Sequence, residues 1–405
     1  MSRIDELIAK HCPDGVEFRR LGECVVKNTG GGTPSRSIPS YWDGDIPWAS
    51  VGDLSVPGNF ILTTRASITS KGLKSSPSNI ISRGDVIVAV KISPGKMKIA
   101  AKDIAINQDL RGLSLHNFIN SSFLTYYFQT ISIVGNGTIV KGITTDTLER
   151  IRVPIPPLEV QREIVKVLDT FTKLEAELEA ELEARRRQYQ YYRNALLTFG
   201  ERTNADASKQ ASKQASKQAS KQARIRWATL GEIAINLDSQ RRPVTKSARE
   251  AGEFPYYGAS GIVDYVSDYI FDGDYLLVSE DGANLLARST PIAFSISGKT
   301  WVNNHAHVLQ FNSYAERRFV EIYLNSIDLS PYVSGAAQPK LNQANLNRIP
   351  IPVPSFEEQE RIVAILDKFD ELVNDLSSGL PAEIKARRQQ YEYYRDRLLT
   401  FRETA

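Results

Sequence analysis

Apolar residues recur in a heptad pattern along two long segments of the chain, with the a and d spacing of a coiled-coil seam. In the first segment, which is interrupted at Glu175 and Arg185, they are Ile164, Leu168, Phe171, Leu178, Leu182, Tyr189, Tyr192, Leu196 and Phe199. In the second segment they are Ile362, Leu366, Phe369, Val373, Leu376, Leu380, Ile384, Tyr391, Tyr394, Leu398 and Phe401. Each segment therefore predicts a long amphipathic helix.

The ends of these helices follow from residues that favour or prevent helix. Prolines precede each segment, so each helix is expected to start just after them: Pro154, Pro156 and Pro157 in the first, and Pro350, Pro352 and Pro354 in the second. Ser355 is the expected N-cap of the second helix. Gly379 and Pro381 predict a kink or break within the second segment.

Both segments belong to a duplication. Residues 154–171, PIPPLEVQREIVKVLDTF, return as residues 352–369, PVPSFEEQERIVAILDKF, and residues 184–199 return as 386–401. The duplication predicts a pseudo-two-fold molecule in which the long helices form an antiparallel coiled coil that separates two domains. The alternative is that each helix packs only on its neighbouring domain.

The blocks between the repeats, residues 18–150 and 227–348, resemble each other faintly over their whole length. Each opens with Leu-Gly-Glu and closes with a glycine-containing loop, a lysine and a Leu-x-x-Ile motif. Strand-like runs such as GDVIVAV and GDYLLVS mix with helical patches. We predict an α+β chain with two globular, mixed α/β domains of common fold and diverged surface.

A tandem array, ASKQASKQASKQASKQA, occupies residues 207–223 after the first helical segment. Its residues are good or neutral helix formers, which favours a helix. Repulsion between its lysines at (i, i+4) spacing is mildly destabilising. A flexible linker is the alternative.

The composition is that of an ordinary globular protein, with 405 residues, 24% charged residues and a formal net charge of +3. No apolar run reaches the ~20 residues that span a bilayer, so no membrane partner is expected. Cys12 and Cys24 are too few for a disulfide framework, and a reducing cytoplasm is the expected location. The mildly basic charge permits nucleic-acid binding without arguing for it.

Recognisable catalytic motifs are missing from the sequence. It has no P-loop lysine motif and no zinc spacing, and GNGTIVKG at residues 135–142 does not match a dinucleotide fingerprint. His305 and His307 lie two apart in a strand-like run and would point the same way; we interpret them as a satisfied polar cluster rather than a metal site. We therefore expect no cofactor, metal or catalytic residue on this chain.

Several motifs resemble those of the DNA specificity subunits of type I restriction-modification systems, and the resemblance covers essentially the whole chain. They are IPVPSFEEQERI (351–362) with its counterpart VPIPPLEVQREI (153–164), the paired entries FRRLGEC and WATLGEI, and the exit GAAQPKLNQANLNRI (335–349). The first copy departs at Val160, where the family pattern has glutamate.

The resemblance implies a non-catalytic subunit that reads a bipartite, asymmetric target on double-stranded DNA. Its helices would dock two methyltransferase subunits, and restriction subunits would join them. S-adenosylmethionine, ATP and magnesium are then expected on the partner subunits only. A coiled-coil scaffold that binds only proteins is the alternative, and a nuclease with an unrecognised site is another.

The resemblance and the repeats together suggest five segments. They are an N-terminal arm with the first target recognition domain (1–153), the first conserved helical region (154–200), the ASKQ linker (201–226), the second target recognition domain (227–351) and the second conserved helical region (352–405).

Basic and amide side chains are the candidates for DNA contact, because phosphates attract Lys and Arg while base edges take Arg, Asn and Gln. In the first domain they are Lys91, Lys96, Lys98, Lys102, Gln108, Arg111 and Lys141. In the second domain they are Arg241, Arg242, Lys246, Arg288, Asn303, Asn304 and Lys340. A solvated surface role is the alternative for each of them.

The ASKQ array predicts a measurable effect on the target. One helical unit of four residues adds about 6 Å and turns about 40° beyond a full turn. One DNA base pair turns about 34–36° and rises about 3.4 Å, so the angle matches and the rise overshoots. We expect deletion of Ala219 to Gln222 to shorten the unread spacer between the two halves of the target. Mapping of methylated sites measures the spacer, and an unchanged length contradicts the prediction.

Overall fold

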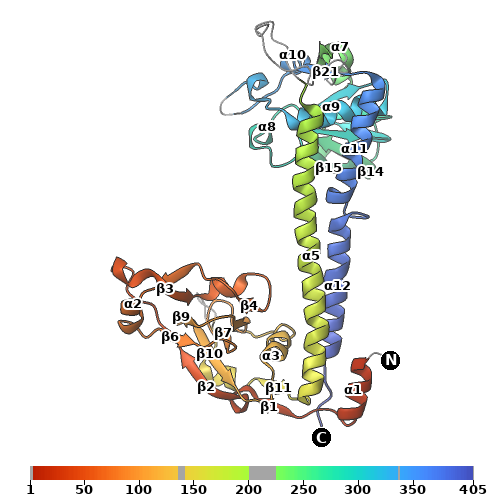
Figure 1. Ribbon diagram of the computed structural model, residues 1–405. Coiled ribbons are helices and arrows are strands. Elements are labelled where there is room, and N and C mark those ends of the chain that lie inside the picture. The colour runs from red at the N-terminus through yellow and green to blue at the C-terminus, as the bar shows by residue number, and fades with distance from the viewer. Residues whose placement is uncertain (1–2, 136–141, 200–224, 336–337, 405) are drawn as a thin grey trace, which may run out of the picture. The chain divides into compact units, whose positions relative to one another are not determined.

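The computed structural model describes residues 3–135, 142–199, 225–335 and 338–404. The chain forms two compact units, residues 1–180 with 382–405, and residues 181–381. Each unit holds a mixed α/β domain and part of a helix pair (Figure 1). The ASKQ array lies outside the described residues, and the five segment boundaries stay predictions. None of the helices in the described ranges is long and apolar enough to cross a membrane.

The domain of the first unit is built on two sheets, with strand orders β2-β10-β7-β8-β4 and β5-β3-β9-β6. The bounds of the first sheet are Val25–Gly30 (β2), Leu110–Leu115 (β10), Val86–Ala89 (β7), Met97–Ala100 (β8) and Phe60–Ile61 (β4). Those of the second are Ala66–Ile68 (β5), Trp42–Ala49 (β3), Ile104–Ile106 (β9) and Asn79–Ile81 (β6). Strand β7 is buried on both faces, because Val86 and Val88 enter one apolar cluster while Ile87 and Ala89 enter another.

The domain of the second unit repeats this plan, with strand orders β13-β20-β17-β18 and β15-β14-β19-β16. The bounds of the first sheet are Ile235–Asn236 (β13), Ala306–Gln310 (β20), Tyr275–Ser279 (β17) and Ala293–Ile296 (β18). Those of the second are Gly261–Val266 (β15), Ala251–Gly258 (β14), Lys299–Val302 (β19) and Phe271–Asp272 (β16). Along β17, Leu276 and Val278 face one cluster and Leu277 the other. The expectation of two domains with a common fold is confirmed.

A short antiparallel strand pair joins the entry and exit of each domain. The pairs are β1 (Phe18–Arg20) with β11 (Arg152–Pro154), and β12 (Arg226–Thr229) with β21 (Pro350–Val353). The N–H of Leu21 then donates to the Ile151 carbonyl at 2.7 Å, and that of Leu230 donates to Ile349 at 2.9 Å. The Leu-Gly-Glu and Leu-x-x-Ile motifs of the sequence therefore meet in space. We call each of these strand pairs a clasp.

In the first unit, the first part of α5 (Leu158–Leu197) lies alongside α12 (Leu380–Leu399), as Figure 1 shows. Phe171 stacks on Tyr394 with 5.5 Å between ring centroids. Further along α5, Glu175 accepts a hydrogen bond from Arg388. Residue numbers rise along α5 as they fall along α12, so the two helices are antiparallel. Helix α3 (Ser121–Phe128) of the domain also contacts α5, since the Tyr126 hydroxyl donates to Asp169 at 2.6 Å.

In the second unit, the last part of α5 packs against α11 (Phe356–Asn374). Tyr192 stacks on Phe369 with 5.5 Å between ring centroids, and Leu197 enters the apolar core that also holds Ile362. Helix α9 (Tyr314–Ser326) of the domain packs on α11 as well. Each long helix therefore packs both on a second helix and on its neighbouring domain, and the two alternatives left by the sequence occur together.

The limits of these helices largely follow the sequence signals. Helix α5 begins at Leu158, directly after the prolines, and Ser355 caps α11 by accepting from a backbone N–H in its first turn. Helix α11 ends at Asn374 and α12 begins at Leu380, which confirms the break predicted in the second segment. One seam position is wrong: Leu376 is 79% exposed, because it lies in that break.

A buried charge cluster ties α9 to α11. Arg318 donates to Asp367 at 2.7 Å, to Asp370 at 2.6 Å and to Glu321 at 2.5 Å, and its side chain is 16% exposed. Burial raises the pKa of Glu321 against the lowering effect of Arg318. The guanidinium therefore neutralises carboxylates that would otherwise stay uncompensated inside the unit.

Arg318→Ala is expected to lower the free energy of unfolding of the second unit by about 3–5 kcal/mol, because it leaves these acidic groups unpaired. Arg361→Ala on α11 is the matched control: Arg361 pairs with exposed Glu358, and its loss should cost under about 1 kcal/mol. Denaturant unfolding, monitored by hydrogen exchange of the backbone amides in α9 and α11, measures the free energy of unfolding of both variants. Equal losses would contradict the assignment.

Candidate nucleic-acid interface

Polar residues gather in both domains where corresponding strands begin or end. In the first unit they lie in segments that follow β2 and β7 and precede β10: residues 31–33, 90–92 and 107–109. In the second unit they follow β13 and β17 and precede β20: residues 237–241, 280–282 and 303–305. Since β10 and β20 run antiparallel to their neighbours, these ends share one edge of each sheet. We call these segments the polar edge.

Strand register assigns matching positions on the two polar edges. The matched backbone pairs are Ala89–Leu110 and Ser279–Ala306 within the strands, followed by the hydrogen-bonded pairs Val90–Asp109 at 2.8 Å and Glu280–His305 at 2.9 Å. Lys91 therefore corresponds to Asp281, and Asp109 corresponds to His305. The backbone of the polar edge is the same in both domains, while its side chains differ.

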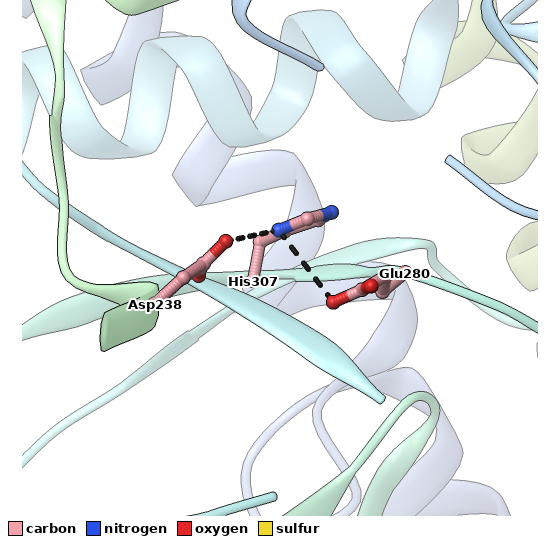
Figure 2. Close-up of side chains that lie close together, drawn as sticks. All are labelled: Asp238, Glu280 and His307. Carbon is pink, nitrogen blue, oxygen red and sulfur yellow. Dashed lines mark hydrogen bonds and ion pairs between the residues drawn. The ribbon is translucent and has the colours of Figure 1, made fainter. Parts of the chain in front are cut away.

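A buried polar cluster supports the polar edge of the second domain (Figure 2). His307 Nδ1 lies 2.5 Å from Asp238 Oδ2 and 3.9 Å from a Glu280 oxygen. Its Nε2 lies 2.7 Å from the carbonyl oxygen of Leu341. That carbonyl only accepts, so Nε2 donates to it, while Nδ1 faces the Asp238 carboxylate.

Cationic side chains complete this cluster. Arg241 donates to Glu280 at 2.6 Å and lies 3.4 Å from Asp238, while Lys340 lies 3.2 Å from Glu280. Burial acts to raise the pKa of Asp238, but the hydrogen bond and charge of His307 hold that pKa below its usual value. The pKa of Glu280 is likewise lowered against burial, chiefly by the hydrogen bond from Arg241.

The cluster resembles a metal site in composition only. Asp238, Glu280 and His307 offer ligand atoms within 4.8 Å of one another. Both nitrogens of His307 are already engaged, however, and the carboxylates face cations, which describes an ion-pair network better than a metal site. His305 does not join it: this residue lies in the turn before β20, exposed, with Nδ1 2.8 Å from Asp281. The expectation that the two histidines point the same way is wrong, because only His307 is in the strand.

The first domain supports its polar edge differently. Arg111 donates from Nε to Asn28 Oδ1 at 2.7 Å. Gly30, its strand partner, makes room for the guanidinium, since a Cβ there would lie 2.9 Å from Nη1. On the segment that follows β7, Lys91 lies 3.7 Å from Asp109, beside an open hollow of about 560 Å³.

The structure brings about half of the predicted DNA contacts to the polar edges and leaves the rest elsewhere. At or against the edges are Lys91, Gln108, Arg111, Arg241, Asn303, Asn304 and Lys340. On other segments are Lys96, Lys98, Lys102, Arg242, Lys246 and Arg288. Lys141 lies outside the described residues. Of those at the edges, Lys91, Gln108, Asn304 and Lys340 are exposed.

Contacts within the chain occupy several of these side chains. Lys98 is 4% exposed, and its amine donates to the carbonyls of Val56, Pro57 and Gly58. Arg288 donates to the Ile327 carbonyl. The prediction of direct DNA contact is corrected for these two residues, because their donors already serve the fold.

Two further corrections concern residues of the second edge. Asn303 is buried, and its Oδ1 accepts from the His305 N–H at 2.8 Å. Arg241 is mostly buried in the ion-pair network, with its side chain 13% exposed. Both hold the polar edge in shape instead of facing outward.

The acidic members of the polar edge escaped the sequence reasoning. Asp109 and Asp281 were not among the candidates, because no spacing along the chain reveals which strand ends meet. The available signal was the polar cluster that interrupts each alternating run, INQDL in the first domain and NNHAH in the second.

Comparison with known proteins places the chain among DNA specificity proteins. A family model described as "Type I restriction modification DNA specificity domain" matches residues 13–184 and again 224–386. The chain is 29% identical to the type I restriction enzyme EcoprrI specificity subunit of Escherichia coli over 391 residues, 90% of each chain. It is 39% identical to a putative type I restriction enzyme specificity subunit of Haemophilus influenzae over 185 residues, 45% of this chain and 48% of that one.

Solved structures have the same fold. The type I restriction-modification S subunit of M. genitalium matches with a TM-score of 0.57 at 18% identity, covering 95% of this chain and 96% of that one. A chain from a study of assembly and conformational transition of the type I R-M system matches with a TM-score of 0.58 at 19% identity, covering 96% and 98%.

The lowered pKa values of Asp238 and Glu280 make the second unit sensitive to acid. Because the folded carboxyls have lower pKa values than the unfolded ones, they stabilise the unit above about pH 5, and this contribution is lost as pH falls below about 4. Asp238→Asn is expected to cost about 3 kcal/mol at pH 7 and to flatten this acid limb. Denaturant unfolding from pH 7 to pH 3 measures both effects. Asp272→Asn, an exposed control, should change neither, and an unflattened limb in Asp238→Asn argues against the network.

Proposed function

Since the chain belongs to the family of type I restriction modification DNA specificity domains, and is by that membership a specificity subunit of a type I restriction-modification system, we propose that each of its domains reads one half of a split, asymmetric DNA sequence. The main support for this proposal is that one fold occurs twice with different polar edges. Two surfaces on a common frame suit two different half-sites, the two halves of the target.

The side chains divide into readers, phosphate contacts and supports. The exposed readers at the polar edges are Lys91, Gln108, Asn304 and Lys340. The exposed cations away from the edges, Lys96, Lys102, Arg242 and Lys246, contact phosphates, which position the domains without reading sequence. Arg111 and Arg241 hold the edges from beneath.

The partners are double-stranded DNA, two methyltransferase subunits and the restriction subunits, which dock on the helical regions. S-adenosylmethionine, ATP and magnesium belong to those subunits, and this chain acts in the cytoplasm without catalysis of its own. Burial raises the pKa of Cys24 to about 11, so its thiol stays protonated near neutral pH and is a poor nucleophile. This supports recognition over chemistry.

A scaffold that binds only proteins is not favoured, because the matching family is described by DNA specificity and its match covers both domains. The two proposals differ in their dependence on salt, because neutralised phosphates release counterions when a protein binds DNA.

Band shifts with the purified subunit test the proposal. The duplex should contain the sequence that the complete modification system methylates, as found by mapping methylated sites. Affinity for it should fall at least about tenfold between 50 and 200 mM salt, because several phosphates are neutralised. A shuffled duplex should bind more weakly at each salt concentration. The same samples with magnesium should show no cleavage. Binding that ignores both salt and sequence would leave the scaffold as the better proposal.

A further inference from the structure

A polar pair occupies the same position on both polar edges, with donor and acceptor exchanged. In the first domain Lys91 lies 3.7 Å from Asp109, with side chains 51% and 17% exposed. In the second domain Asp281, at the position of Lys91, lies 2.8 Å from His305, with side chains 33% and 51% exposed. The hydrogen-bond donor of one domain therefore stands where the other has its acceptor.

The backbone beneath each pair is fixed in the same way. The N–H of Asp109 donates to the side-chain oxygen of Asn107 at 3.1 Å, and the N–H of His305 donates to that of Asn303 at 2.8 Å. These matched bonds hold the backbones of Asp109 and His305 in equivalent positions. The exchange of donor and acceptor is thus a difference of surface chemistry rather than of fold.

The turn that follows this position takes a left-handed conformation in both domains. Gly282 has φ 103°, which glycine adopts freely, whereas Ile92 has φ 68° in the first domain. A β-branched residue there is strained by about 1–3 kcal/mol. Ile92 is 60% exposed, so burial within its own chain does little to offset that strain. Strain beside an exposed polar pair is typical of a binding site.

Relative energies allow these pairs to be redirected to DNA. An exposed ion pair contributes about 0–1 kcal/mol. A good contact to a base edge contributes about 1–3 kcal/mol of discrimination. Opening the exposed pairs is therefore inexpensive, in contrast to the buried contact between His307 and Asp238 beneath them.

We propose that these pairs each read one G·C base pair in the major groove, in opposite strand orientations. Lys91 donates to guanine while Asp109 accepts from the amino group of cytosine, and His305 and Asp281 play the same two roles from exchanged positions. The proposal rests on the DNA-reading function above and adds the identity of one base pair in each half-site.

The double variant Asp281→Lys with His305→Asp gives the second domain the charge order of the first. Cells carrying the complete modification system are the assay, and methylated sites are mapped genome-wide. The expected result is reversal of one G·C pair in the half-site of the second domain, with the other half-site and the spacer unchanged. The same half-site in variant and parent overturns the proposal.

Asp281→Asn tests the same base assignment if the double variant does not fold. It keeps the size of the side chain and removes its charge, so preference for the G·C pair at that position should fall by roughly tenfold. Asp272→Lys is the control. The exposed Asp272 is the backbone register partner of Lys299 at the start of β19, whereas the polar edge follows the end of that strand. It should leave both half-sites as they are.

These arms separate two failures. A parent chain that directs no sequence-specific methylation refutes the proposed function itself. A parent that methylates a defined target, together with an Asp281→Asn variant that keeps full G·C preference, refutes only the assignment of the readers.

Discussion

The clasp at the entry and exit of each domain is the constraint on which the rest of the structure depends. It pairs the strand that enters the domain with the strand that leads into a long helix, β1 with β11 and β12 with β21. Glycine fits closely just after each entry strand, since a Cβ at Gly22 would lie 3.2 Å from Glu149 and one at Gly231 would lie 3.0 Å from Asn347. Because both ends of each domain meet at its clasp, everything between them can change without altering how the helix begins.

Burial separates the part of each domain that holds the fold from the part that is free to vary. Strand β7 is buried on both faces and carries only aliphatic side chains, and β17 is buried from Leu276 to Ser279, so large-to-small replacements there would leave cavities. The polar edges begin directly beyond these strands, and their exposed side chains, such as Lys91 and Asn304, can be substituted at little cost to the fold. A protein that must change what it reads while keeping its frame needs this sharp boundary between strand and edge.

The sequence predicts the long helices, the break between α11 and α12 and the duplicated domains, because these depend on local patterns and on visible repeats. Sequence reasoning named several polar-edge residues but did not predict that they meet at one edge of each sheet or that buried acidic groups support them. Asp238 and His307 are far apart in the chain, and only the pairing of β13 with β20 brings them together. It also counted Lys98 among exposed cations, since a lysine whose amine caps its own chain's carbonyls looks the same in sequence as one that faces solvent.

Divergence between the domains proceeds in coupled pairs. Where the first domain has Gly30 beneath Arg111, the second has Asp238 at the corresponding strand position, facing His307. An aspartate at Gly30 would displace the guanidinium of Arg111, since even a Cβ there would lie 2.9 Å from Nη1, and a glycine at Asp238 would leave His307 and Arg241 without their carboxylate. A single substitution beneath the edge therefore disturbs a partner in either domain, whereas exchange of a whole domain at its clasp preserves every pair. The fold thus favours new specificity through domain exchange, and confines point changes to the exposed layer above.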